Sequence, residues 1–91
     1  PTASAVLGEI SLSPNPTALE AQVQFDLHQA AEVLIEVLDL DGHTLYTQQA
    51  EGIAGQNRQP LRLANMGSGT FIVQLSTQGE RRIGKLVVLR P

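Results

Sequence analysis

The sequence predicts an all-β fold, an antiparallel β-sandwich of about seven short strands. Apolar and polar residues alternate through much of the chain, as at Val23, Phe25 and Leu27, and such alternation is typical of strands with one face in a core. Turn-forming residues separate the alternating runs at short, regular intervals, which is the spacing of sandwich strands. No segment has convincing helical periodicity, so the prediction contains strands and turns alone.

The strand boundaries follow from the alternating runs and from the turn signals between them. Val33–Val37 is a run rich in β-branched residues, which favour strands, and a last run begins at Ile83. Asp41–Gly42 lies between two such runs, which is the strongest short hairpin signal, and Gln78–Glu80 indicates a second hairpin. We expect strands near residues 8–13, 20–28, 31–40, 43–50, 58–64, 70–77 and 81–89.

Size and composition narrow the classes of function. A chain of 91 residues forms one domain with a thin core, which leaves little apolar surface to line a deep pocket. The absence of Cys excludes disulfides, thiolate metal sites and cysteine nucleophiles, and no apolar run is long enough to span a membrane. We expect residues 1–7, which are mostly small, to be a linker from an upstream cargo domain, and residues 8–91 to form the domain.

Charge is distributed unevenly along the chain. Residues 1–57 contain eight carboxylates and no Lys or Arg, whereas residues 58–91 contain all six basic residues and a single carboxylate, Glu80. Either neighbouring strands of opposite sign attract one another, or a basic C-terminal surface meets a partner. Nucleic acid is not expected as the partner, because three aromatic residues and a net charge of −3 provide neither a stacking platform nor a basic face.

Residues with catalytic or metal-binding chemistry do not form a recognisable site in the sequence. Asp39–His43 begins like a calcium loop, but the fifth-position ligand and the distant Glu of that loop are missing. His28 and His43 are the only histidines, and a zinc site would need further ligands from carboxylates. Gly67–Gly69 precedes a strand, unlike the nucleophile elbow of hydrolases. We therefore expect no enzymatic activity, no cofactor and no metal, and interpret Asp41–Gly42 as a hairpin turn.

Four segments follow one another in the order of the motifs of one family. Leu12–Thr17 is similar to an opening aromatic-Pro-Asn-Pro motif, and Val33–His43 to an apolar strand that ends in Asp-Leu-x-Gly-Arg. Leu63–Leu75 is similar to the strand entry Leu-x-x-Leu-x-x-Gly-x-Tyr-x-Val, and Lys85–Arg90 to a terminal Lys-Leu-Val-Val signature. Over residues 10–91 the chain thus resembles the type A C-terminal sorting domain of the type IX secretion system. The structural motif residues are Pro14, Asn15, Pro16, Asp39, Gly42, Gly69 and Phe71.

The chain departs from the family pattern at a few positions. Leu12 replaces the aromatic residue of the first motif, and His43 replaces the Arg after the turn glycine. Phe71 replaces the Tyr of the third motif, and Gly67 stands where the family often has proline. The tail has one Lys and one Arg, where many members have more basic residues.

The resemblance implies an immunoglobulin-like sandwich that acts as an export signal for a cargo domain in the same chain. The cargo would pass through the periplasm, and the outer-membrane translocon would then recognise the folded domain. A cell-surface sortase would remove it by cleavage in or before the linker, around Pro1–Gly8, leaving the cargo attached to the surface or released. The family's recognition determinant maps onto the last strand and the terminus, here Lys85, Leu86, Val87, Val88, Leu89 and Arg90.

Two interpretations of this last segment remain open. A terminal strand can add to the edge of another sheet, and Leu86 and Val88 would then contribute apolar side chains on the face opposite Val87 and Leu89. Exposed edge strands would also allow a weak homodimer. Alternatively, the segment is simply the last strand of the core.

Two other functions share parts of this pattern. A structural or adhesive module, such as the immunoglobulin-like domain of flagellar hook-capping proteins, has a similar strand and turn but usually a Trp-Asp-Gly segment, and this chain has no Trp. An accessory carbohydrate-binding domain of a secreted hydrolase would present exposed aromatic rings to sugars, and Tyr46 is the one candidate for such a position.

Overall fold

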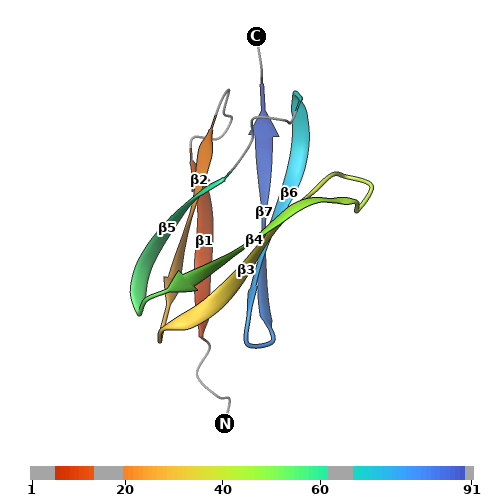
Figure 1. The fold of residues 1–91 in the computed structure, drawn as a ribbon. Helices are drawn as coiled ribbons and strands as arrows, with labels where there is room; N and C mark the ends of the chain where they lie inside the picture. The colour runs from red at the N-terminus through yellow and green to blue at the C-terminus, as the bar shows by residue number, and fades with distance from the viewer. Residues whose placement is uncertain (1–5, 14–19, 62–66, 90–91) are drawn as a thin grey trace.

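Seven strands in two antiparallel sheets make up the fold of this chain, for which the computed structural model describes residues 6–13, 20–61 and 67–89. The three-stranded sheet has the order β1-β2-β5 and the four-stranded sheet the order β4-β3-β6-β7, and the two sheets face each other (Figure 1). The predicted antiparallel sandwich is confirmed. The strands are β1 Leu7–Ser13, β2 Ala21–Leu27, β3 Ala31–Leu38, β4 Thr44–Gly52, β5 Gly55–Leu61, β6 Gly69–Thr77 and β7 Glu80–Val88.

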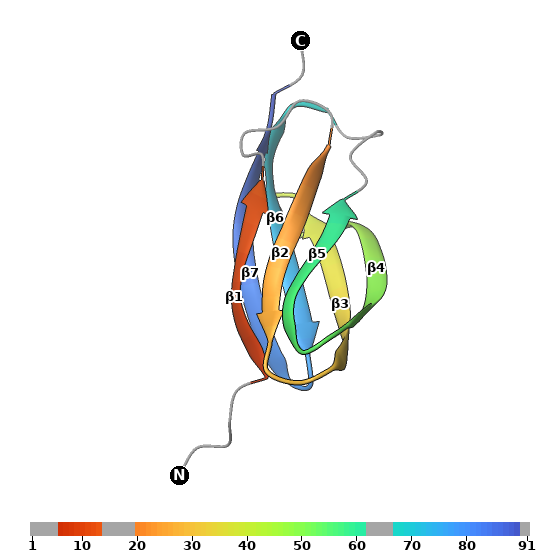
Figure 2. The same ribbon diagram turned by 90° about the vertical axis from the view of Figure 1, so that its left-hand side faces the viewer.

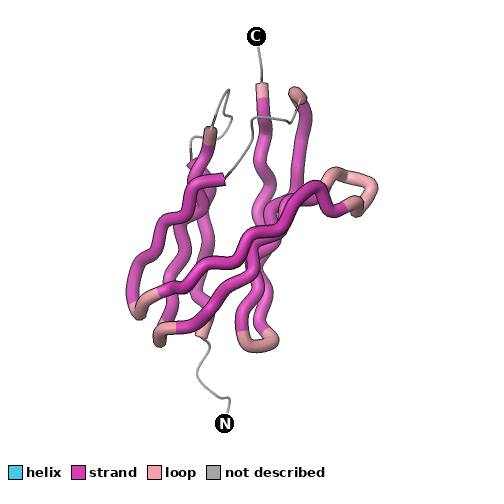
Figure 3. Tube along the Cα trace, viewed as in Figure 1, coloured by secondary structure: helices cyan, strands magenta, loops and turns pink. Residues whose placement is uncertain are grey.

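Short turns join most neighbouring strands, as Figure 3 shows by colour. None of the described residues forms a helix long and apolar enough to cross a membrane.

The core lies between the sheets and is built by the period-two alternation of the strands. In β2 and β3 every second side chain points inward, because successive side chains of a strand face opposite sides of its sheet. The largest fully buried side chains are Phe25, Leu7, Ile35, Leu75, Leu86, Val23, Val33, Val37, Val73 and Val88. Thr77 is buried as well, and its hydroxyl donates a hydrogen bond of 2.7 Å to the backbone oxygen of Glu32.

Strand β5 differs most from its expected position. It begins at Gly55 and not near residue 58, whereas the ends of the other strands lie within two residues of the prediction. Its sequence, Gly-Gln-Asn-Arg-Gln-Pro-Leu, has too few apolar residues to show alternation. The strand is instead defined by pairing with β2, in a register that places Gln24 opposite Arg58.

Asn57 fixes the corner where the chain passes from β4 to β5 and so from one sheet to the other. Its side-chain amide accepts a hydrogen bond from the Ile53 N–H at 2.9 Å and donates one to the Ile53 oxygen at 2.9 Å. The same amide donates to the oxygen of Gly55 at 3.1 Å. This corner satisfies backbone groups that no ladder serves, and it sets the start of β5.

The first and last strands lie side by side and run in the same direction. Leu7 contacts residues at the start of β7, and the side chain of Leu12 lies beside Gly84 further along β7. Figure 2 shows β1 and β7 next to each other, with the arrowhead of β1 toward the pole at which β7 ends. The chain therefore enters β1 beside the β6–β7 hairpin and leaves β7 at the opposite pole of the sandwich (Figure 1).

Candidate functional site

The predicted recognition residues lie on β7, and the structure divides them between the two faces of that strand. Leu86 and Val88 are fully buried. Lys85 is exposed, Val87 is half-buried and Leu89, just after the strand, is 58% exposed. Arg90 lies outside the described residues. The segment thus supplies core residues and surface residues in alternation.

Leu86 and Val88, which lie on the face of β7 opposite Val87 and Leu89, are not accessible to a partner in the folded domain. Both belong to the cluster that fills the space between the sheets. The sequence did not settle which face of β7 points inward, because apolar residues stand at four consecutive positions from Leu86 to Leu89. Among the described residues of the segment, the accessible side chains are those of Lys85, Val87 and Leu89.

Two motifs of the family meet as cross-strand neighbours in the β6–β7 hairpin. Gly69 begins β6 and pairs with Val88, and Phe71 pairs with Leu86. Phe71 is half-buried and packs against the core. The third motif therefore supports the inner side of the terminal strand. The proline motif residues Pro14, Asn15 and Pro16 lie outside the described residues.

Glu80 and Arg82 join the start of β7 to the start of β1. The Val6 and Leu7 N–H groups donate to the Glu80 carboxylate at 2.7 and 3.2 Å, and Arg82 Nη2 donates to the Leu7 oxygen at 3.1 Å. The hydrogen bond from Val6 is the main cause that lowers the pKa of Glu80 below its usual range, with Leu7 and the nearby Arg82 adding to it. We call these four residues the β1–β7 junction.

Gly84 lets β1 approach β7 closely beyond this junction. A Cβ atom at this position would lie 3.0 Å from Leu12 Cδ1 and 3.4 Å from Ile10 Cδ1, which is tighter than ordinary van der Waals contact. The leucine and isoleucine side chains thus occupy the space that a larger residue would need. A side chain at this position would therefore require the Leu12 and Ile10 side chains to shift.

The junction was not foreseen from the sequence. Glu80 is the single carboxylate among the basic residues of the C-terminal third, and this isolation is the one available signal. Val6 and Leu7 were assigned to the linker, but both are buried in the core. The small residues before them masked the start of the strand, and the fold includes chain from Val6 onward.

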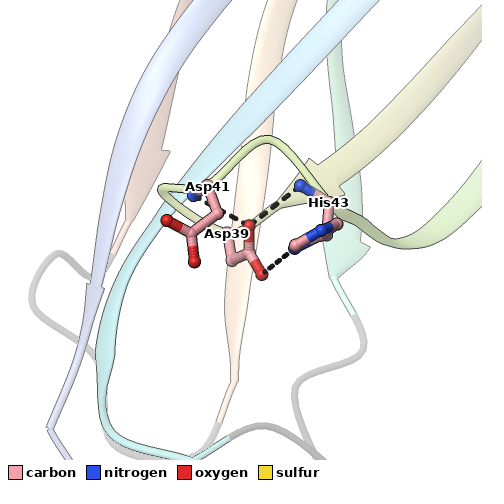
Figure 4. Close-up of side chains that lie close together, drawn as sticks. All are labelled: Asp39, Asp41 and His43. Carbon is pink, nitrogen blue, oxygen red and sulfur yellow. Dashed lines mark hydrogen bonds and ion pairs between the residues drawn. The ribbon is translucent and has the colours of Figure 1, made fainter.

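Asp39 organises the turn between β3 and β4, where the sequence predicted a hairpin (Figure 4). Its Oδ1 accepts hydrogen bonds from the N–H groups of Asp41 and His43, both at 2.9 Å, and its Oδ2 lies 3.3 Å from His43 Nδ1. The hydrogen bond from the His43 N–H is the main cause that lowers the pKa of Asp39. Gly42 has φ +93°, which favours glycine. The predicted hairpin is confirmed.

The same three side chains are close enough to share a cation. Ligand atoms of Asp39, Asp41 and His43 lie within 4.8 Å of one another. Both oxygens of Asp39 already hold the turn, however, and His43 and Asp41 are exposed. The hydrogen bonds of Asp39 within the turn explain why these three side chains lie close together.

Tyr46 does not occupy the outward position that a sugar-binding surface requires. It pairs with Val37 in the β3–β4 ladder and packs, half-buried, against the core. The ring therefore contributes to the interior of the sandwich. This placement removes the one aromatic candidate for stacking on a carbohydrate.

Comparison with known proteins gives one family. A family model described as a secretion system C-terminal sorting domain matches residues 11–89. A search of curated proteins gave no match. The matched segment begins within β1 and extends just beyond β7, so it includes both hairpins and the strand that carries the terminal motif.

Proposed function

This chain belongs to the C-terminal sorting domains of the type IX secretion system, which are export signals, and we propose that it directs an upstream cargo domain from the periplasm through the outer membrane. The secretion translocon in that membrane recognises the sorting domain. A cell-surface sortase then removes it, and the cargo is attached to the surface or released. The family match over residues 11–89 carries the proposal.

The translocon contacts the outward side chains of the terminal segment. Lys85, Val87 and Leu89 supply a cation and two apolar groups on the outer side of the sheet, and Arg90 extends the segment. Leu86 and Val88 act indirectly, because their burial holds the strand in place. Recognition thus depends on a surface that exists only when β7 is folded into its sheet.

The arrangement of the chain ends supports this division of roles. The N-terminal end of β1 and the C-terminal end of β7 lie at opposite poles of the sandwich (Figure 1). A cargo domain attached before β1 is therefore directed away from the pole at which the tail leaves. A translocon component can bind the tail without meeting the cargo.

Removal by the sortase takes place before Val6. The backbone N–H groups of Val6 and Leu7 are bound by Glu80, and the Val6 oxygen accepts a hydrogen bond from the His28 N–H at 2.8 Å. Proteases cleave exposed chain that they can draw into an extended conformation, and these residues are held within the fold. The cleavage range expected from the sequence, Pro1–Gly8, thus narrows to the residues that precede Val6.

A reporter fusion in a host with this secretion system tests the proposal. The domain is fused to the C-terminus of a periplasmic reporter, and surface display is measured by protease treatment of intact cells. We expect the reporter at the surface or in the medium. In a Lys85→Glu/Leu89→Asp variant we expect at least a tenfold lower surface signal, because both side chains point outward and the fold is kept.

A matched control separates the export function from the assignment of residues. Thr47→Glu/Gln49→Asp changes two exposed positions on β4, and the purified variants are compared by circular dichroism and thermal unfolding. A reporter that stays in the periplasm with the unaltered domain contradicts the export function. Export that survives in the β7 variant contradicts only the recognition residues.

A further inference from the structure

The edge of β4 is the most open of the four sheet edges that the structure describes. The edge strands are β1 and β5 in one sheet and β4 and β7 in the other, and β1 and β7 cover each other along their lengths. β5 contains Pro60, which has no N–H for a further strand, and the exposed charge of Arg58, and both residues discourage pairing. β4 pairs with β3 alone and diverges from β5 beyond their shared corner (Figure 1).

A hydrogen bond of β3 shows which backbone groups of β4 point toward the open edge. The oxygen of Glu32 accepts the hydroxyl of Thr77 in β6, so the backbone groups of Glu32 face β6 and not β4. Its partner in β4 is Glu51, and successive pairs of an antiparallel ladder alternate between bonded and non-bonded. Thr47, Gln49 and Glu51 therefore direct their N–H and C=O groups away from β3.

The regular part of this edge has few of the features that keep strand edges apart. The β3–β4 ladder has its register shift at the turn end, between Val37 and Leu38, and is regular from Tyr46 to Gly52. That stretch reads Tyr-Thr-Gln-Gln-Ala-Glu-Gly, without proline or lysine and with its one charge at Glu51. Edges that avoid further strands commonly carry charges, proline or a bulge. The edge is thus suited to pairing over this stretch.

We propose that the edge of β4 pairs antiparallel with β4 of a second copy of this chain, about a two-fold axis at Gln48. Thr47 of each copy then pairs with Gln49 of the other, and these residues exchange backbone hydrogen bonds through their outward groups. Glu51 stands opposite Leu45 of the second copy, so the carboxylates of the two copies do not face each other. One self-complementary edge is what a two-fold interface requires.

The side chains on both sides of the joined sheet suit this register. On the inward side, Tyr46 and Ala50 are half-buried and pack against the core, and the pairing places Tyr46 of one copy opposite Ala50 of the other. On the outward side, the Thr47 hydroxyl and the Gln49 amide stand opposite each other as hydrogen-bonding groups. Apolar groups thus meet apolar groups, and polar groups meet polar groups.

The backbone edge of β4 stays accessible although one side chain bridges to the other sheet. Gln48 pairs with the buried Ile35 and so points inward, and its Nε2 donates to the Pro60 oxygen of β5 at 3.3 Å. The homodimer expected from exposed strand edges is thus assigned to β4. Its contact is confined to one short strand of each copy, which is less than a permanent interface buries, so the dimer is weak and concentration-dependent.

Sedimentation equilibrium of the 91-residue chain from micromolar to millimolar concentration tests the proposal. We expect a reversible monomer–dimer equilibrium, and Gln49→Pro should raise its dissociation constant at least about tenfold, because it removes one N–H donor of each copy from the contact. This N–H does not bind β3, so the fold is kept, as circular dichroism and thermal unfolding will show. Gln49→Ala is the matched control. It loses the same side chain but retains the N–H, so its dissociation constant should stay within about threefold.

Disulfide cross-linking tests the register, because the chain has no Cys of its own. Directly paired residues have Cα atoms about 5.5 Å apart, within reach of a disulfide, whereas diagonal positions about 7–8 Å apart are too distant. A mixture of the Thr47→Cys and Gln49→Cys variants should therefore form linked dimers at least about tenfold faster under an oxidant than either variant alone.

Three results overturn the proposal. They are a chain that stays monomeric up to millimolar concentration, equal dissociation constants for Gln49→Pro and Gln49→Ala, and cross-linking that is as fast in a single variant as in the mixture. If Gln49→Pro also abolishes export of the reporter while the unaltered chain is monomeric, a strand of the translocon and not a second copy occupies the edge. The export function is tested separately, by the reporter fused to the unaltered domain.

Discussion

The two faces of β7 carry residues that are adjacent in sequence but differ in what surrounds them. Leu86 and Val88 are fully buried between the sheets, whereas Lys85, Val87 and Leu89 point away from the core. A deletion of the terminal segment removes both sets at once. Loss of export after such a deletion therefore does not distinguish an unfolded domain from a missing contact, and the inward and outward residues must be changed separately.

The largest expected difference is between neighbouring core and surface positions. Leu86→Ala should lower the free energy of unfolding by about 2–5 kcal/mol, because it leaves a cavity in a closely packed core. Val87→Ala, one residue further, should change it by less than about 1 kcal/mol. Urea unfolding followed by circular dichroism measures both. Equal losses in the two variants would mean that the faces of β7 are not distinct.

A smaller loss is expected where the inward face of β7 meets β1. Gly84→Val should destabilise the domain by about 1–3 kcal/mol through overpacking, since its side chain would enter the space of Leu12 and Ile10. Gly67→Val is the matched control, because no described residue lies within 4 Å of a Cβ atom there. Thermal unfolding of both variants measures the difference. Similar unfolding temperatures for the two would contradict the close approach of β1 and β7.

The smallest expected effect concerns pH and the β1–β7 junction. The pKa of Glu80 is lowered in the fold from an ordinary value of 4.5 by its hydrogen bonds to Val6 and Leu7. A carboxylate with a depressed pKa stabilises the folded state above the unfolded pKa and loses this contribution as the pH falls through the folded value. Glu80→Gln should therefore be less stable than the unaltered chain at pH 7, with a difference that shrinks below pH 4.5.

Urea midpoints of the two proteins between pH 7 and pH 3 measure this convergence. A difference that stays constant over the whole range would show that the carboxylate charge of Glu80 does not strengthen the junction. Lys85→Gln, on the outward face of β7, is the control for Glu80→Gln, because it removes a charge that is not part of the β1–β7 junction.

The alternation of apolar and polar residues predicted the strands whose two faces differ in polarity. The alternation at Val23, Phe25 and Leu27 predicts one face in the core, and all three residues are buried. The last strand could not be oriented in this way, because residues on both of its faces are apolar. Where neither face of a strand is clearly polar, packing against the opposite sheet determines which face is buried.

Contacts between distant segments could not be predicted from the sequence, for a different reason. Glu80 binds Val6 across 74 positions of the chain, and nothing in either segment specifies that the start of β7 docks beside the start of β1. The turn at Asp39 was predictable because its partners lie within four residues. Local hydrogen bonds can be recognised in the sequence, whereas the junction depends on the assembled sandwich.

The parallel course of β1 and β7 determines how the domain bears mechanical load. If the tail is held while the cargo is pulled, the force acts at opposite poles, along β1 in one direction and along β7 in the other. The Glu80 and Arg82 hydrogen bonds and the packing around Gly84 are then sheared together and not broken one after another. Forced unfolding is governed by the unfolding rate, and contacts that must break together keep this rate low. We therefore expect a high rupture force when single molecules are stretched between their ends.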